Sequence, residues 1–220
     1  MERVIRVKGT GKVATPPDLV EISLTINGIS KNYEKAMKQA EEKLSHFKDD
    51  LLSLGFKEED LKTVNFQVNT NYESIRDENN QYKSVFTGFT CRHDLLLSFD
   101  FTKEKLADVL NVLSQGEKEL EFRLNFTVKD PESLTEKLLE SAAKNARKKA
   151  EILCAASKVT LGELVNIDYS WEEISLYSDT NFRMPNQLMG KSAVMEANVA
   201  FQPKDVESTD TATFIWAIKS

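Results

Sequence analysis

The sequence has few of the residues that cross-link a fold or interrupt its helices and strands, and it has no long apolar run. Its 220 residues include two cysteines, two histidines, five prolines and eight glycines. So few cysteines exclude a disulfide-rich scaffold, and two thiols far apart in the sequence suit a protein that keeps them reduced. No segment approaches the roughly 18 consecutive apolar residues of a membrane-spanning helix. A chain of this length needs no disulfide or metal to complete its core.

An excess of basic charge is also absent, because 29 basic and 35 acidic side chains give a net charge of -6. Binding to phosphates requires a basic surface, so we expect no nucleic acid partner. Residues 1–8 carry interspersed charges and lack the apolar run of a signal peptide. From this N-terminus and the cysteine content we expect a cytoplasmic protein.

Apolar periodicity predicts long helices between strands. Residues recurring every three or four positions predict helices over 32–54, 103–114 and 131–157. Gly55 suits the end of the first helix, and Asp130 followed by proline suits the start of the third. The inner stripe of the third helix changes from leucine to alanine along its length, so its C-terminal half is able to approach a neighbouring element closely.

Strict alternation of apolar and polar residues predicts strands. They cover residues 20–26, 64–68, 89–101, 120–128, 165–169, 193–201 and 212–218. Turn-forming residues 77–80 indicate that the second and third of these form an extended hairpin. The chain is therefore predicted to be an α+β protein in which long amphipathic helices pack on a mostly antiparallel sheet. We expect one domain over residues 1–220.

Residues 172–191 fit neither periodicity and are predicted to form a projecting loop or irregular segment. Methionine and other apolar side chains occur in it, so it is either a surface that binds a partner or a loop that covers its own domain.

The chemical candidates are few. Cys91 and His93 lie two apart on one strand face, a spacing that suits a thiol–imidazole pair or two metal ligands, although the same face continues as apolar core. The glycines Gly9 and Gly11 suit a bend or bulge in a strand and lack the context of a phosphate-binding loop. No carboxylate stands in an apolar setting that would favour acid–base chemistry. We therefore predict no catalytic, cofactor-binding or metal-binding residues and no cofactor.

Four segments in order carry a resemblance to a known family. They are residues 9–24 (GTGKVATPPDLVEISL), 60–72 (DLKTVNFQVNTNY), 87–89 (TGF) and 146–164 (ARKKAEILCAASKVTLGEL). This order and spacing resembles the SIMPL-domain family over nearly the whole chain. The resemblance implies an α+β fold and, in some bacterial members, large ring-like or channel-like homo-oligomers. It implies no established enzymatic activity, and it implies export for many bacterial members.

Three classes of function remain open at this stage. The first is a non-enzymatic protein that acts by homo-oligomerisation or by binding another protein. The second is a module that binds a small molecule or peptide in a groove between helices and sheet. The third is an unrecognised thiol enzyme that uses Cys91 and His93.

Overall fold

A computed structural model of the chain describes residues 3–76, 80–115, 121–170, 174–180 and 202–219. The chain forms two compact units, each built from separate segments of the sequence. Unit 1 comprises Met1–Asp18, Phe126–Thr180 and Pro203–Ser220, and unit 2 comprises Leu19–Asn125 and Asn181–Gln202. Both units combine helices with antiparallel sheet, so the predicted α+β class is confirmed. The prediction of a single domain over residues 1–220 stays a prediction.

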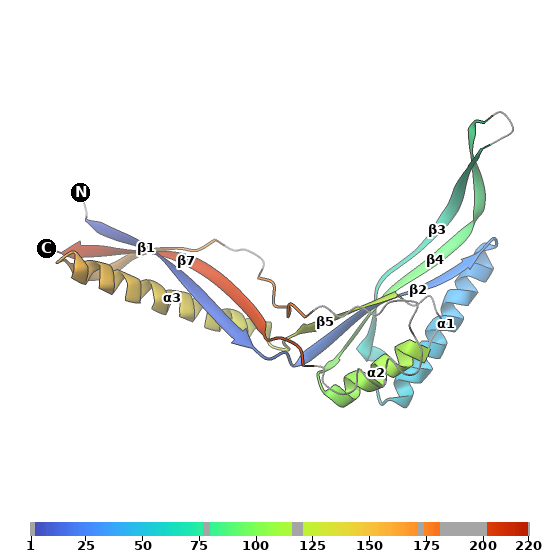
Figure 1. Cartoon of the computed structure of the whole chain (residues 1–220), viewed down its shortest axis with the longest axis horizontal. Helices are drawn as coiled ribbons and strands as arrows, with labels where there is room; N and C mark the ends of the chain where they lie inside the picture. The colour runs from blue at the N-terminus through green and yellow to red at the C-terminus, as the bar shows by residue number, and fades with distance from the viewer. Residues whose placement is uncertain (1–2, 77–79, 116–120, 171–173, 181–201, 220) are drawn as a thin grey trace. The chain divides into compact units, whose positions relative to one another are not determined.

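Unit 1 is a three-stranded sheet covered by one helix. The sheet, here called sheet A, has the order β1-β7-β6 and is antiparallel throughout. Its strands are β1 (Val4–Thr15), β6 (Thr160–Asp168) and β7 (Val206–Lys219). Helix α3 (Pro131–Ala156) lies along one face of sheet A beside β1 and β7 (Figure 1). The predicted cap is present, since Asp130 Oδ1 accepts a hydrogen bond from the Ser133 amide at 2.9 Å.

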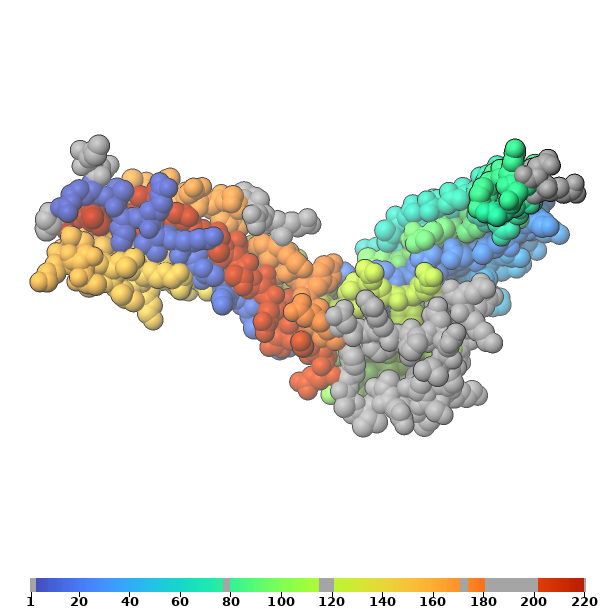
Figure 2. Space-filling view, turned by 45° about the horizontal axis from the view of Figure 1, so that its top comes forward, coloured from blue at the N-terminus to red at the C-terminus, as the bar shows by residue number. Residues whose placement is uncertain are grey.

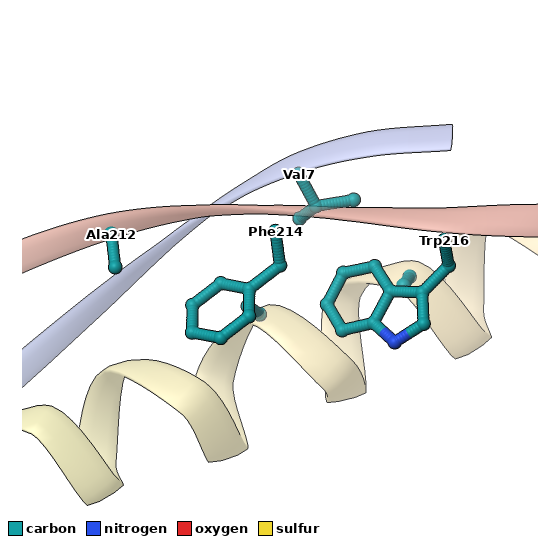
Figure 3. Close-up of a cluster of buried hydrophobic side chains, with 6 residues drawn as sticks. Val7, Ala212, Phe214 and Trp216 are labelled. Atoms are coloured by element: carbon teal, nitrogen blue, oxygen red, sulfur yellow. The ribbon is translucent and has the colours of Figure 1, made fainter. Parts of the chain in front are cut away.

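The core of unit 1 lies between α3 and sheet A. Val7, Phe214 and Trp216 point from the strands toward the helix, as Figure 3 shows. The helix presents Ala146 and Ala150 to them, and both alanines are fully buried. The predicted close approach of this alanine stripe is confirmed, because a large side chain there would keep α3 away from the strands.

The glycines of β1 have a different role from the one that the sequence suggests. Gly9 and Gly11 lie in a regular β1–β7 ladder that shows no register shift, so they form no bulge. A Cβ atom on Gly9 would lie 2.2 Å from the Ala142 carbonyl oxygen of α3, and one on Gly11 would lie 2.0 Å from that of Leu138. The absence of a side chain at these two positions is what lets the helix backbone rest on the strand.

Unit 2 is a four-stranded antiparallel sheet, here called sheet B, with the order β3-β4-β2-β5. The strands are β2 (Leu19–Ser30), β3 (Leu61–Arg76), β4 (Tyr82–Asp100) and β5 (Glu121–Thr127), whose last two residues belong to unit 1. Helices α1 (Tyr33–Ser53) and α2 (Lys103–Gln115) lie on the same face of sheet B (Figure 1), and a short 3-10 turn, η1, spans Glu58–Asp60.

Local signals for the helix end and the hairpin in unit 2 are confirmed. Gly55 adopts a positive φ of 84° after α1, and the Phe56 amide bonds back to the Leu51 carbonyl oxygen at 3.1 Å. Strands β3 and β4 pair along their length in antiparallel register, as predicted for the hairpin. The turn residues 77–79 lie outside the described residues.

The predicted irregular segment, residues 172–191, is described only in part. Residues 174–180 contain neither helix nor strand and fold against unit 1. The Ser178 amide donates to the Phe126 carbonyl oxygen at 2.8 Å, and Thr127 Oγ1 donates to the Leu176 carbonyl oxygen at 2.7 Å. This stretch covers its own unit. Residues 171–173 and 181–201, and with them the predicted strand over 193–201, lie outside the described residues.

Candidate interaction surface

The β3–β4 hairpin extends beyond the rest of sheet B as a two-stranded arm. Pairing between β2 and β4 ends at Ser30 and Phe89, whereas pairing between β3 and β4 continues from Asn71 opposite Gly88 to Arg76 opposite Tyr82. We call residues 71–76 and 82–88 the hairpin arm. A two-stranded ribbon has little core of its own and is marginally stable in water. The stability of the arm therefore depends on the contacts that its side chains make.

A β-bulge at the base of the arm sets the direction of its side chains. The register shifts between Asn71 and Tyr72, where β4 carries one extra residue. Gly88 has a φ of 148° here, and a Cβ atom on it would lie 2.7 Å from the Ser30 carbonyl oxygen. The bulge consequently places Phe86 against Phe89, with ring centroids 5.2 Å apart.

A chain of aromatic contacts connects the arm to α1. Tyr72 meets Phe86 edge to face with centroids 5.8 Å apart, and Phe89 meets Tyr33 at the start of α1 at the same distance. At the far end, the Arg76 guanidinium carbon lies 5.1 Å from the centre of the Tyr82 ring. Such contacts are worth roughly 0.5–1.5 kcal/mol each, so they hold the arm's shape without burying its surface.

Large apolar side chains on the arm remain exposed to solvent. The exposed fraction is 71% for Tyr82, 61% for Tyr72, 47% for Ile75 and 44% for Phe86. The arm forms one exposed end of unit 2, coloured green in the space-filling view (Figure 2). Single exposed apolar residues are common on proteins, whereas clustered ones are typical of interaction surfaces, which makes the arm a candidate.

The two residues of the thiol hypothesis have separate environments. Cys91 is fully buried and packs against Ala36 and Ala40 of α1. His93 stands at the rim, where its Nε2 lies 2.8 Å from Thr63 Oγ1 and its ring meets Phe66 edge to face. Partial burial, and then the charge of Lys48, lower the pKa of His93 below its ordinary value. In the part of the chain that the structure describes, no third metal-ligating side chain joins this pair.

Burial raises the pKa of the Cys91 thiol, the opposite of what an activated nucleophile needs. We expect a thiol reagent to label Cys91 about a thousandfold more slowly in the native protein than in urea, because labelling requires transient unfolding. A Cys154→Ser variant isolates the Cys91 signal for this measurement. Rapid labelling of Cys91 in the native protein that persists below pH 7 would support the thiol-enzyme hypothesis.

The face of sheet B opposite its helices carries a polar cluster whose members hydrogen-bond to one another. Asp94 accepts hydrogen bonds from Thr25 Oγ1 at 2.7 Å, Arg92 Nε at 2.9 Å and Asn65 Nδ2 at 3.2 Å. Partial burial by itself would raise the pKa of the Asp94 carboxyl, but these hydrogen bonds and the Arg92 charge lower it below its ordinary value. A carboxylate held ionised in this way is suited to fixing strand positions rather than to proton transfer.

These features define a class: an α+β protein of two antiparallel sheets, each with helix packed on one face, with exposed apolar side chains on a hairpin arm. No helix among the described residues has the length and apolar content needed to cross a bilayer. The chain belongs to the SIMPL family, described as a protein of unknown function (DUF541), whose profile matches residues 5–216. The resemblance carried by the four segments is thereby confirmed.

Curated relatives share the family but assign no activity. The chain is 26% identical over 171 residues to the "26 kDa periplasmic immunogenic protein" of Brucella melitensis and of Brucella abortus, a match that covers 74% of this chain and 65% of each relative. It is 26% identical over 167 residues to the "Uncharacterized protein YggE" of Edwardsiella ictaluri, covering 73% of this chain and 65% of that protein. The chain thus spans just under two thirds of the length of these relatives.

The names of the Brucella proteins overturn one prediction. A cytoplasmic location was expected from the N-terminus and from the two thiols, but proteins that match most of this chain are named periplasmic. The cytoplasmic prediction is wrong. Its reasoning failed because two thiols stay reduced through burial as well as through a reducing compartment, and both Cys91 and Cys154 are free and buried.

The sequence reasoning identified the hairpin but missed the arm as a surface. The alternation predicts a strand only over residues 89–101, whereas β4 has 19 residues and β2 has 12. A strand that outruns its neighbour must leave part of its length with one partner only. Within the part of the chain that the structure describes, no helix covers the apolar residues of the arm.

Proposed function

We propose that this protein is non-enzymatic and acts by self-association, with the hairpin arm as the contact between copies. The observation that carries this proposal is the exposure of Tyr72, Ile75, Tyr82 and Phe86 on a ribbon that sheet B extends past its own helices. Burying apolar surface contributes about 25 cal/mol per Å². Tyr72, Tyr82 and Phe86 share one face of the ribbon and together supply a substantial driving force for association.

The chemistry of the arm supports a second copy as the partner. Tyrosine and phenylalanine are enriched in the centres of protein interfaces, as is arginine, and the exposed Arg76 is held over the Tyr82 ring. The ribbon carries one acidic residue, Glu73, and two basic residues, Arg76 and Lys83. Two arms are able to pair with each Glu73 beside a basic residue of the other copy. A contact of this kind closes a symmetric dimer or continues around a ring.

The proposal includes a periplasmic location, which rests on the names of the Brucella relatives. Burial of Cys91 in unit 2 and of Cys154 in unit 1 supports it, because a buried thiol is shielded from oxidants in such a compartment.

Light scattering coupled to size exclusion tests self-association directly. With a chain mass of 25.0 kDa, we expect the native protein to elute with a mass of two or more chains at both of two concentrations a factor of ten apart. A mass of one chain at both concentrations would contradict the proposal.

A further inference from the structure

The two edges of sheet A differ in how their backbone groups are satisfied. Helix α3 lies over β1, and three of its side chains bond to the outer edge of that strand. The Thr10 amide donates to Asn145 Oδ1 at 3.0 Å, the Lys12 amide donates to Ser141 Oγ at 3.3 Å, and Lys149 Nζ donates to the Lys8 carbonyl oxygen at 3.0 Å. The β1 edge is thus closed to a further strand.

The opposite edge of sheet A is formed by β6, and α3 contacts it only slightly. Among the described residues, no side chain bonds to the backbone of Thr160–Asp168 in the way that α3 bonds to β1. Natural edge strands are blunted by lysine, proline, β-bulges or a covering element. Strand β6 contains neither lysine nor proline, and Leu164, Val165 and Ile167 are each about half exposed. Two register shifts against β7, between Leu161 and Leu164 and between Leu164 and Asn166, bend this strand, so the stretch regular enough to accept an added strand is Asn166–Asp168.

A groove runs beside this edge because α3 is displaced toward β1. Its volume is about 520 Å³, within the range of sites that hold ligands. Phe214 and Trp216 of β7 form its floor, and Leu161, Leu164 and Ile167 of β6 form one side. In Figure 3 the rings of Phe214 and Trp216 lie between β7 and α3. Every other side chain of a strand added along β6 would point toward this groove.

The charges around the groove and the edge are acidic. On the rim, Arg147 Nε donates to Glu151 at 3.0 Å, which leaves Glu163 as the unbalanced charge. Asp168 adds a second exposed carboxylate on β6, and no basic residue occurs in Thr160–Asp168. A complementary strand therefore carries lysine or arginine together with apolar residues.

We infer that β6 and its groove bind an extended segment of another protein, in which apolar residues alternate with lysine or arginine, as a fourth strand of sheet A. Main-chain hydrogen bonds to the β6 edge hold the segment, and apolar side chains in the groove select it. A second copy of β6 is a poor occupant, because pairing would bring two Glu163 and two Asp168 carboxylates into one short ladder.

The test uses the full-length protein and two end-blocked, fluorescein-labelled peptides, one alternating lysine with valine and one alternating glutamate with valine. Fluorescence polarisation measures binding to the wild type and to a Glu163→Lys/Asp168→Lys variant. The control is Glu136→Lys/Glu207→Lys, which makes the same charge change at exposed positions of unit 1. We expect the lysine peptide to bind the wild type and the control equally, and the edge variant about tenfold more weakly. The glutamate peptide should bind the edge variant best.

Hydrogen exchange identifies the strand that is joined. The lysine peptide should protect amides of residues 160–168 and leave those of residues 4–15 unchanged. Absence of saturable binding, or equal weakening by both double variants, would overturn the inference. Complete protection of residues 160–168 in the unliganded protein would also overturn it, because another part of this chain would then occupy the edge. Protection that rises with protein concentration alone would overturn it as well, because the occupant would then be a second copy. The native mass of the two double variants should equal that of the wild type, which separates this site from self-association through the arm.

Discussion

Replacing Tyr72 and Phe86 by glutamate should reduce the native mass of the protein to that of one chain. The two side chains form the exposed aromatic centre of the hairpin arm, with ring centroids 5.8 Å apart. In an assembled interface, a carboxylate at either position would be buried without a partner. Central aromatic positions of interfaces contribute about 2 kcal/mol or more each, so the double variant should weaken association about a thousandfold.

A matched control separates the arm from a general effect of added charge. Leu52→Glu/Val64→Glu places the same two charges at exposed apolar positions of unit 2 outside the arm. We expect it to keep the wild-type mass in light scattering. Both double variants should keep the wild-type circular dichroism, because the β2–β4 pairing below Phe89 does not depend on the arm. An arm variant that keeps the wild-type mass would refute the assignment of the contact.

Valine at Gly9 or Gly11 should destabilise unit 1 more than any exposed substitution on the same strand. The new side chain would begin 2.2 Å or 2.0 Å from a carbonyl oxygen of α3, and a helix backbone has no rotamer with which to yield. The helix would have to move away from β1 and lose its packing on Val7. Overpacking of this kind costs about 1–3 kcal/mol, occasionally more, and we expect at least the upper value here.

Urea unfolding followed by far-ultraviolet circular dichroism measures this loss. Lys8→Val and Lys12→Val are the controls, since they add the same β-branched side chain to β1 on exposed positions. They should change the free energy of unfolding by no more than about 0.5 kcal/mol. Replacing glycine also lowers the conformational entropy of the unfolded chain, but this stabilises the folded protein by only about 0.4–1 kcal/mol. Glycine variants as stable as the lysine variants would mean that α3 does not rest on β1.

Much of the fold could be predicted because its signals are local. The first helix ends at Gly55 since that residue supplies the positive φ of the helix end, and the third begins at Asp130 since a carboxylate caps the first turn. The alternation at residues 120–128 and 212–218 likewise reports one buried face of each strand. Such patterns depend only on residues within a few positions of one another.

The candidate site could be predicted only in part. The hairpin followed from two alternating segments around a turn, yet its extension as an exposed arm depends on where β2 ends. For Cys91 and His93, the sequence placed both on one face but could not separate a reactive pair from a core thiol beside a rim imidazole. That distinction required the alanines of α1 above Cys91.

By itself, the sequence determined the three helices, the hairpin, the α+β class, the family resemblance and the small-residue stripe of α3, because each depends on residue type and short-range spacing. Only the tertiary structure decided that β1 pairs with β7, near the opposite end of the chain. It also decided that the α3 backbone packs directly on Gly9 and Gly11, which form no bulge. It also decided that α3 closes one edge of sheet A and leaves β6 open. These outcomes depend on which surfaces, far apart in the sequence, bury one another, and local periodicity does not determine long-range pairing.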